Sequence, residues 1–266
     1  IRVPGLQTSL VEERSRGADV RIVYSPLDAL ALASREPERE VVFAAVGFET
    51  TAPGVASVVL QARERRLANF SVYASHKLIV PAMKAVLEGA SRIEGFITPG
   101  HVSVIIGPEA YEDVAQHYAA PCVATGFEPS DVLEGIAMVL ECIAAKRTGS
   151  FVQYTRAVKP GGNTRAWDIL LRVFDIADAE WRGLGVIPGS GLVLKEAFAS
   201  FDAARRYALP DMAPVQLPRC RCGDVLKGVI HPPECPFFGN ECTPRNPLGP
   251  CMVSSEGSCA ARYKYG

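Results

Sequence analysis

The chain has 266 residues, of which 48% are hydrophobic and 21% charged, and its formal net charge at pH 7 is −1. A near-neutral chain without a long basic block gives no electrostatic reason to expect a nucleic acid or an anionic membrane as partner. Its longest apolar run, residues 136–145, contains Glu141 and is too short to cross about 30 Å of hydrocarbon. We therefore expect a soluble protein, and its length favours two domains.

Short apolar runs alternate with helical patterns over the first half of the chain. Residues 20–24 (VRIVY) predict a strand, and the Ala- and Leu-rich stretch after Pro26 predicts a helix as far as Arg35. Further strands are expected at 41–47, 70–75, 95–100 and 121–126, and helices near 54–67, 78–88, 103–117 and 131–146. Apolar strands that are each followed by a helix favour an α/β fold with a parallel, doubly wound, Rossmann-like sheet covered on both faces.

The helix expected from Asp131 carries apolar residues at helical spacing, which predicts that this face packs in the core. These residues are Val132, Leu133, Ile136, Leu140 and Ile143. Beyond Gly149 the pattern weakens, although a helix near 164–174 and a strand near 184–187 are plausible before the Pro-rich residues 209–218.

Three loops that follow expected strands are rich in polar groups. They read VGFETTAPG (46–54), TPGHVS (98–103) and TGFEPSD (125–131). Ligands bind beyond the carboxyl ends of parallel strands, so Glu49, His101 and Glu128 are candidates for a shared site. Ordinary capping and tight turns also explain such residues, so both interpretations stay open for each single loop.

Three more histidines have weaker claims to a role. His76 also follows an expected strand, and a functional and a purely structural role are about equally supported for it. His117 and His231 are expected at the surface.

Six cysteines lie near the end of the chain. Four fall in CPFFGNECTPRNPLGPCMVSSEGSC (235–259), and Cys220 and Cys222 stand just upstream. Disulfides are disfavoured because the rest of the chain is a large Ala-rich α/β body typical of the cytosol, so a cytoplasmic location is expected. Successive cysteines are separated by 1, 12, 6, 8 and 7 residues, so no C-x-x-C pair occurs among them. This spacing favours a [4Fe–4S] cluster over zinc but leaves zinc or free thiols open.

Several strings together resemble the HypD family of hydrogenase maturation factors. They are GFETTAP, TPGHVSVIIG, GFEPSDVLEG, QYTRAV, WRGLGVIPGSGL, RCGDVLKG, ECPFFGNECTPRNPLG and CMVSSEGSCAARY, in the order expected of the family. The resemblance implies a scaffold that acts with a small HypC-like protein in assembling the Fe(CN)2CO unit of [NiFe] hydrogenases. Cyanide would come from HypE acting with HypF, and a [4Fe–4S] cluster would supply or relay electrons. Such a protein is an assembly factor with a redox role rather than a conventional turnover enzyme.

The resemblance also implies a domain division and site residues. We expect the rest of a first α/β domain at 1–36, a second at 37–148, a connecting segment at 149–218 and the iron–sulfur region at 219–266. The cluster cysteines fall on Cys222, Cys235, Cys242 and Cys259, which leaves Cys220 and Cys251 as extra thiols. The residues expected to act on the cyanide-bearing iron are His101, Glu49, Thr50, Thr51 and Glu128.

The chain also departs from the family pattern. Neither Cys-Gly-x-His nor Gly-Pro-Gly-Cys-Pro-Val-Cys, whose thiols would hold the transient iron, occurs in it, so we expect a truncated chain whose full-length parent carries that iron. The alternative function is a zinc-stabilised protein-interaction module on an α/β domain. A nucleotide-binding enzyme is least favoured, because neither G-x-G-x-x-G nor a P-loop string is present.

Overall fold

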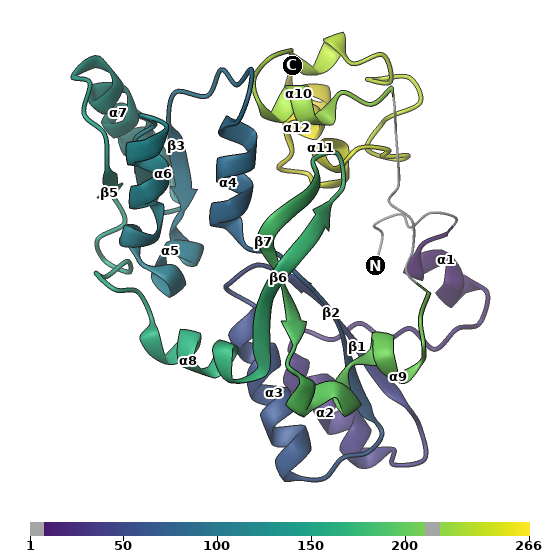
Figure 1. Cartoon of the computed structure of the whole chain (residues 1–266). Coiled ribbons are helices and arrows are strands. Elements are labelled where there is room, and N and C mark those ends of the chain that lie inside the picture. Colours follow the sequence, from purple (N-terminus) through teal and green to yellow (C-terminus); the bar gives the residue numbers. More distant parts are fainter. Residues whose placement is uncertain (1–7, 211–218) are drawn as a thin grey trace.

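The computed structural model describes residues 8–210 and 219–266. This part of the chain is a mixed α/β fold whose parallel strands lie in two small sheets, accompanied by a long antiparallel ribbon (Figure 1). The α/β class and the parallel pairing are confirmed, whereas the expectation of one doubly wound sheet is wrong. Which strands share a sheet depends on long-range packing that short apolar runs do not encode. The expected domain boundaries stay a prediction.

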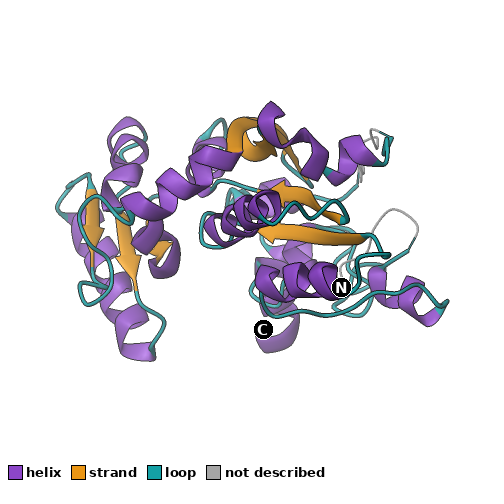
Figure 2. Ribbon diagram, turned by 90° about the horizontal axis from the view of Figure 1, so that it is seen from below, coloured by secondary structure: helices purple, strands orange, loops and turns teal. Residues whose placement is uncertain are grey.

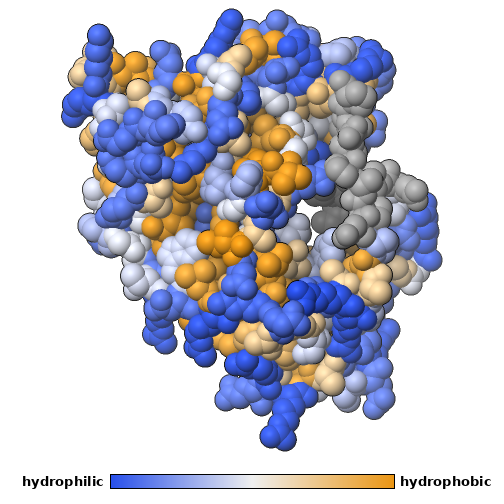
Figure 3. All heavy atoms as spheres, in the orientation of Figure 1, coloured by the Kyte–Doolittle hydropathy of each residue, from blue (hydrophilic) through white to orange (hydrophobic). Residues whose placement is uncertain are grey.

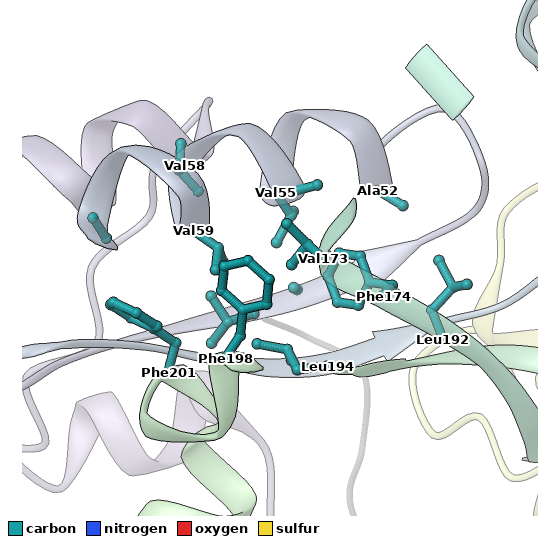
Figure 4. Close-up of a cluster of buried hydrophobic side chains, with 14 of the residues drawn as sticks. Ala52, Val55, Val58, Val59, Val173, Phe174, Leu192, Leu194, Phe198 and Phe201 are labelled. Atoms are coloured by element: carbon teal, nitrogen blue, oxygen red, sulfur yellow. The ribbon is translucent and has the colours of Figure 1, made fainter. Parts of the chain in front are cut away.

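The first sheet pairs β1 (Val41–Gly47) with β2 (Phe70–His76) in parallel. Two helices pack against it, α2 (Pro26–Arg35) and α3 (Ala52–Glu64). Figure 4 shows Val55 and Val59 of α3 pointing toward residues of the antiparallel ribbon and of the turn after it. The labelled members of this core are Ala52, Val55, Val58, Val59, Val173, Phe174, Leu192, Leu194, Phe198 and Phe201.

The prediction of a strand at residues 20–24 is wrong. These residues form no strand, and Ile22 and Tyr24 are exposed. A capping box begins α2 directly after them, because Ser25 accepts a hydrogen bond from the backbone N–H of Leu27 and Asp28 accepts one from that of Ser25. A similar box at Ser9 begins a short helix, α1 (Leu10–Ser15), that the sequence did not predict.

The second sheet has the order β3 (Phe96–Pro99), β4 (Cys122–Thr125) and β5 (Ser150–Val152), all parallel. Its separate core is built by α4 (Ile79–Leu87), α5 (Gly100–Ile106), the 3-10 turn η1 (Pro108–Tyr111) and α6 (Glu112–His117). Figure 2 shows this sheet standing apart from the first. The strands β3 and β4 and the helix α4 confirm the prediction, whereas β5 was not foreseen.

The helix α7 (Pro129–Ala144) forms where predicted but faces the other way. Its buried residues are Asp131, Gly135 and Cys142, while Leu133 and Leu140 are largely exposed. Gly135 lies so close to Thr125 that an added Cβ would be 2.1 Å from its Cγ2, so the small side of the helix rests on β4. The prediction that the apolar stripe packs in the core is therefore wrong.

The ribbon joins β6 (Phe174–Trp181) to β7 (Gly185–Leu194) in antiparallel pairing, after α8 (Thr164–Val173). The helix confirms the prediction, but the strand expected at 184–187 is longer and its partner β6 was missed. Figure 3 shows hydrophobic residues along this ribbon and beside α4. The chain continues through a 3-10 segment, η2 (Glu196–Phe201), and the short helix α9 (Ala203–Arg206).

The cysteine-rich residues 219–266 sit at the tip of the ribbon (Figure 1). Four short elements interrupt their irregular chain, namely α10 (Cys222–Leu226), η3 (Pro232–Glu234), α11 (Pro250–Val253) and α12 (Ser258–Tyr265). Within the described residues, none of the helices combines the length and the apolar character that a membrane span requires.

Candidate functional site

The GFETT loop leaves β1 through a turn that only glycine fits. Gly47 has a φ of 144°, and an added Cβ would be 2.2 Å from Oγ1 of Thr51. The Thr51 hydroxyl donates to the carbonyl of Phe48 at 3.1 Å and makes no side-chain cap to α3. Thr50 is half-buried and Thr51 is exposed, so both predicted residues lie at this strand exit.

Glu49 of the same loop is 2% exposed, unlike a solvated turn carboxylate. Its Oε1 accepts a hydrogen bond of 2.9 Å from the backbone N–H of Ile79, at the start of α4. Its Oε2 has no hydrogen-bond partner among the described residues. Burial raises the pKa of this carboxyl group above its ordinary value, so the protonated form is favoured more than it is in water.

A buried tyrosine connects Glu49 with the PGHVS loop. The hydroxyl of Tyr111 lies 3.2 Å from Oγ of Ser103, and that serine donates to the carbonyl of Pro99 at 3.0 Å. Burial raises the pKa of Tyr111 to about 12, and the negative charge of Glu49 adds to the increase. Glu49 is therefore within electrostatic reach of the tyrosine. Sequence reasoning missed Tyr111, because a single tyrosine in a Pro-Glu-Ala-Tyr turn carries no spacing signal.

His101 lies on the exposed side of the PGHVS loop, at the second position of α5. Its ring stacks on that of Phe127, with centroids 5.0 Å apart and an interplanar angle of 30°. The pairing of Pro99 with Thr125 brings the two loops to the same sheet edge. The structure therefore places TPGHVS beside TGFEPSD, as predicted, whereas the GFETT loop belongs to the other sheet.

In the TGFEPSD loop the structurally fixed charge is Asp131 rather than Glu128. Glu128 is exposed at the start of α7, where its backbone N–H donates to Asp131. Asp131 accepts hydrogen bonds from both terminal nitrogens of Arg156 and from Gln153. The Arg156 guanidinium, helped by Gln153, holds the pKa of Asp131 well below its usual range. Sequence reasoning missed this network, although Gln153 and Arg156 both lie in the QYTRAV string.

His76 is 1% exposed at the end of β2 and does not join the rim. Its ring packs edge-on against Phe174 at 5.6 Å, and neither ring nitrogen has a hydrogen-bond partner among the described residues. Burial lowers the pKa of His76 to about 4, so the imidazole is neutral near pH 7. These surroundings favour the structural role over the functional one.

The tail cysteines gather in a small core of their own. Cys222, Cys235, Cys242, Cys251 and Cys259 are buried, Cys220 is half-buried, and all eight cysteines of the chain are free thiols. Four of the buried cysteines pack with Val225, Met252 and Ala260. Sulfur atoms therefore fill much of the space that aliphatic side chains occupy in an ordinary core.

Contacts within this region bring the thiols close together. The Sγ atoms of Cys251 and Cys259 are 3.1 Å apart, and Sγ of Cys242 accepts from the backbone N–H of Leu248 at 3.4 Å. An added Cβ on Gly249 would be 2.7 Å from Sγ of Cys220 and 3.8 Å from that of Cys251. The two extra cysteines therefore both lie close to Gly249.

The ribbon tip holds the tail against the α/β body. An added Cβ on Gly183 would be 3.5 Å from Sγ of Cys222, so the turn of the ribbon touches this thiol. Directly before the turn, Trp181 donates to Oγ of Ser190 at 2.8 Å and packs against Phe48 with ring centroids 6.1 Å apart. The ribbon thus connects the cysteine region with the GFETT loop.

The donor set fits an iron–sulfur cluster. Thiolates are the ligands that such clusters require, and here they come from an irregular, Pro-rich segment that folds around them. A hydrogen bond to Cys251 and burial raise the pKa of Cys222, and burial together with neighbouring thiols raises that of Cys259. Buried thiols with raised pKa values are stabilised as thiolates when a metal supplies positive charge. Within residues 8–210 and 219–266, no group of three or more His, Cys, Asp or Glu side chains is arranged so that it could hold a metal ion, so the fit rests on the chemistry of the donors.

The fold and site define an α/β protein with a cysteine-rich C-terminal region and a histidine exposed at a strand-exit loop. The model of the HypD family, described as "Hydrogenase formation hypA family", matches residues 1–266. Hydrogenase maturation factor HypD of Azotobacter vinelandii is 46% identical over 274 residues, which cover 100% of this chain and 72% of the relative. The Escherichia coli protein of the same name is 45% identical over 267 residues, with the same coverage. The chain therefore belongs to the HypD family of hydrogenase maturation factors.

Proposed function

We propose that this chain acts as an assembly scaffold in [NiFe] hydrogenase maturation, where the Fe(CN)2CO unit is built on it as a cargo. A small HypC-like protein is its partner in carrying this iron, and HypE acting with HypF provides the cyanide. Family membership supports the general role. The burial of Cys222, Cys242 and Cys259 in one cluster, together with Cys251, is the observation that carries the more specific proposal.

The tail holds a [4Fe–4S] cluster through Cys222, Cys235, Cys242 and Cys259. When bound, the cluster supplies one-electron chemistry. Cys235 is 7% exposed, and its thiol is among those whose charge acts on Cys220 and Cys259, so all four proposed ligands belong to one region. The surrounding phenyl rings and Leu248 limit the access of water to the sulfur atoms, which contributes to setting a cluster's potential.

Metal analysis after anaerobic purification tests the cluster. We expect about four iron and four sulfide per chain with a broad visible absorbance, as a [4Fe–4S] cluster requires. Replacing Cys259→Ser should remove most of the iron, whereas the matched change Cys142→Ser, at a buried cysteine in α7, should not. One zinc per chain with neither iron nor sulfide would support the alternative, a zinc-stabilised protein-interaction module, and refute the cluster.

His101 provides the proton chemistry of the site. Its imidazole is exposed and stacks on the ring of Phe127, and the ring nitrogens of a histidine can carry and donate a proton. A proton donated from its ring nitrogen stabilises negative charge that develops on cyanide nitrogen during transfer. Glu128, exposed in the adjacent loop, contributes negative charge at the same rim.

The GFETT loop supplies a second set of polar side chains to the proposed site. Thr50 and Thr51 offer hydroxyl groups at the exit of β1, and Glu49 holds the start of α4 in place through its bond to Ile79. The raised pKa of Glu49 allows this carboxyl group to hold a proton nearer to neutral pH than an ordinary glutamate does. Glu49 therefore acts by positioning the loop and by retaining a proton.

Replacing His101→Ala in the full-length protein tests the assignment of the histidine. We expect hydrogenase maturation to be lost while the thermal unfolding temperature stays the same, since the ring is exposed. His117→Ala, at another exposed histidine, is the matched control and should retain maturation. Full maturation by the His101→Ala protein would refute the role, and it would leave the metal analysis of the tail unaffected.

A further inference from the structure

The outer side of α7 is an apolar stripe that the described fold leaves uncovered. Leu133, Ile136 and Leu140 are 68%, 40% and 60% exposed, and they recur at the spacing i, i+3, i+7 that places residues on one side of a helix. Ala137 and Ala144 are exposed on the same side, where their small side chains allow another chain to approach closely. A surface helix normally turns polar residues toward water, so this arrangement indicates an interaction surface.

One edge of the stripe is acidic. Glu134 and Glu141 are exposed, stand seven residues apart and therefore lie on the same side of α7. Glu134 accepts a hydrogen bond of 2.9 Å from the neutral amide of Gln153, which leaves its charge uncompensated by that contact. The nearby Arg156 is already paired with Asp131.

This charge pattern disfavours a second copy of the chain as the occupant. In an antiparallel pair related by a two-fold axis, Glu134 of one copy would lie level with Glu141 of the other on the same side of the contact, so like charges would meet. In a parallel pair each acidic edge would face the Val132 side of the other copy, which is apolar. An anionic membrane surface is disfavoured by the same carboxylates.

We propose that this α7 stripe, formed by Leu133, Ile136, Ala137 and Leu140, binds an amphipathic helix of another protein. The apolar face of that helix covers the stripe, and Lys or Arg residues on its edge pair with Glu134 and Glu141. Phe127 stands two residues before the start of α7, and its ring lies 5.0 Å from that of His101, so the helix that carries the stripe begins beside the exposed histidine. This surface goes beyond the proposed function, which assigns no contact face.

Site-specific photo-crosslinking in hydrogenase-producing cells tests the proposal on the full-length protein. A photoreactive phenylalanine analogue replaces Ala137, and in a separate control it replaces the exposed Arg65 at the end of α3. We expect an adduct at position 137 that mass spectrometry maps to a helix of a different protein, with apolar residues three or four positions apart and flanking Lys or Arg. The adduct yield should fall about tenfold when Glu134→Lys and Glu141→Lys are combined.

The matched control variant is Glu64→Lys, at another exposed helical glutamate, which should leave the yield unchanged. Circular dichroism melting confirms that each variant is folded. An adduct between two copies of this chain, an adduct insensitive to the double charge reversal, or a yield no higher than at position 65 would each overturn the proposal. The metal content of the tail is measured on the same samples, so a failure here is distinguishable from a failure of the proposed cluster.

Discussion

Neutral burial of His76 makes the stability of the fold depend on pH. The ring is 1% exposed, its two nitrogens have no hydrogen-bond partner among the described residues, and burial lowers its pKa from 6.5 to about 4. As the pH falls through 6.5, His76 takes up a proton in the unfolded chain, whereas in the folded chain it does so only near pH 4. The contribution of His76 to stability is therefore present above pH 6.5 and is lost progressively toward pH 4.

The size of this loss follows from the two pKa values. Linkage gives a decrease of about 2 kcal/mol in the free energy of unfolding between pH 7.5 and pH 5, approaching about 3 kcal/mol below pH 4. Replacing His76→Leu removes the titrating group and two unpaired buried nitrogens, so the variant should be at least as stable as the parent at pH 7.5. At pH 5 the variant should therefore retain the roughly 2 kcal/mol of unfolding free energy that the parent loses between pH 7.5 and pH 5.

Urea unfolding followed by circular dichroism at pH 7.5, 6.5, 5.5 and 5 measures the effect. His117→Gln is the matched control, because this exposed histidine keeps its contact with water in the folded chain, and its pH profile should follow that of the parent. If the His76→Leu protein loses as much stability as the parent over this range, burial of the neutral ring is not the cause and the reasoning fails.

Two further changes test close packing and the carboxyl group of Glu49. Gly135→Ala should destabilise the fold by about 1–3 kcal/mol in urea unfolding, because the new Cβ would be 2.1 Å from Cγ2 of Thr125, whereas Gly54→Ala in α3, where the new Cβ would be 3.7 Å from Cγ of Pro26, should be neutral or stabilising; equal effects of the two would contradict this packing. Glu49→Gln keeps the acceptor for Ile79 but cannot ionise. Because the pKa of Glu49 is raised in the folded chain, its contribution to stability is present below pH 4.5 and is lost as the pH rises through the folded pKa. The parent should therefore lose stability relative to the Glu49→Gln protein over that interval. Parallel pH profiles of the two proteins would contradict the raised pKa.

Local patterns predicted the elements better than their arrangement. Apolar runs followed by helical spacing located β1 to β4 and α2 to α4, because each run reflects the burial of its own residues. They did not show that β1 and β2 lie in a different sheet from β3 and β4, which long-range pairing decides. The β6–β7 ribbon had a usable signal, since residues 182–184, with Gly183, separate two extended runs.

The α7 helix shows why a correct helix assignment can give a wrong core. Its amphipathic spacing indicated an apolar face, but spacing alone does not say what that face contacts. Gly135 allows the opposite side of the helix to approach Thr125, and Asp131 on that side is held by Arg156 and Gln153. These contacts orient the helix so that Leu133 and Leu140 face outward.

Residue chemistry alone made His101 and the tail cysteines candidates, and their roles stay predictions. The structure shows that His101 is exposed at a strand-exit loop and that five of the six tail cysteines are buried. Tyr111 was not identifiable, because its link to Ser103 depends on how a 3-10 turn packs beneath α5. The Asp131–Arg156 pair joins residues 25 positions apart, and no local pattern indicates such a contact.

The β6–β7 ribbon contacts both the GFETT loop and the cysteine-rich tail. Trp181 contacts Phe48 in the GFETT loop, and Gly183, only two residues later, lies against Cys222 in the tail. The other end of the ribbon is fixed in the main core through Phe174 and Leu194. A strand pair that is fixed at one end also limits the movement of its other end, because its backbone hydrogen bonds resist bending. The ribbon end therefore lies between the GFETT loop and the thiol of Cys222.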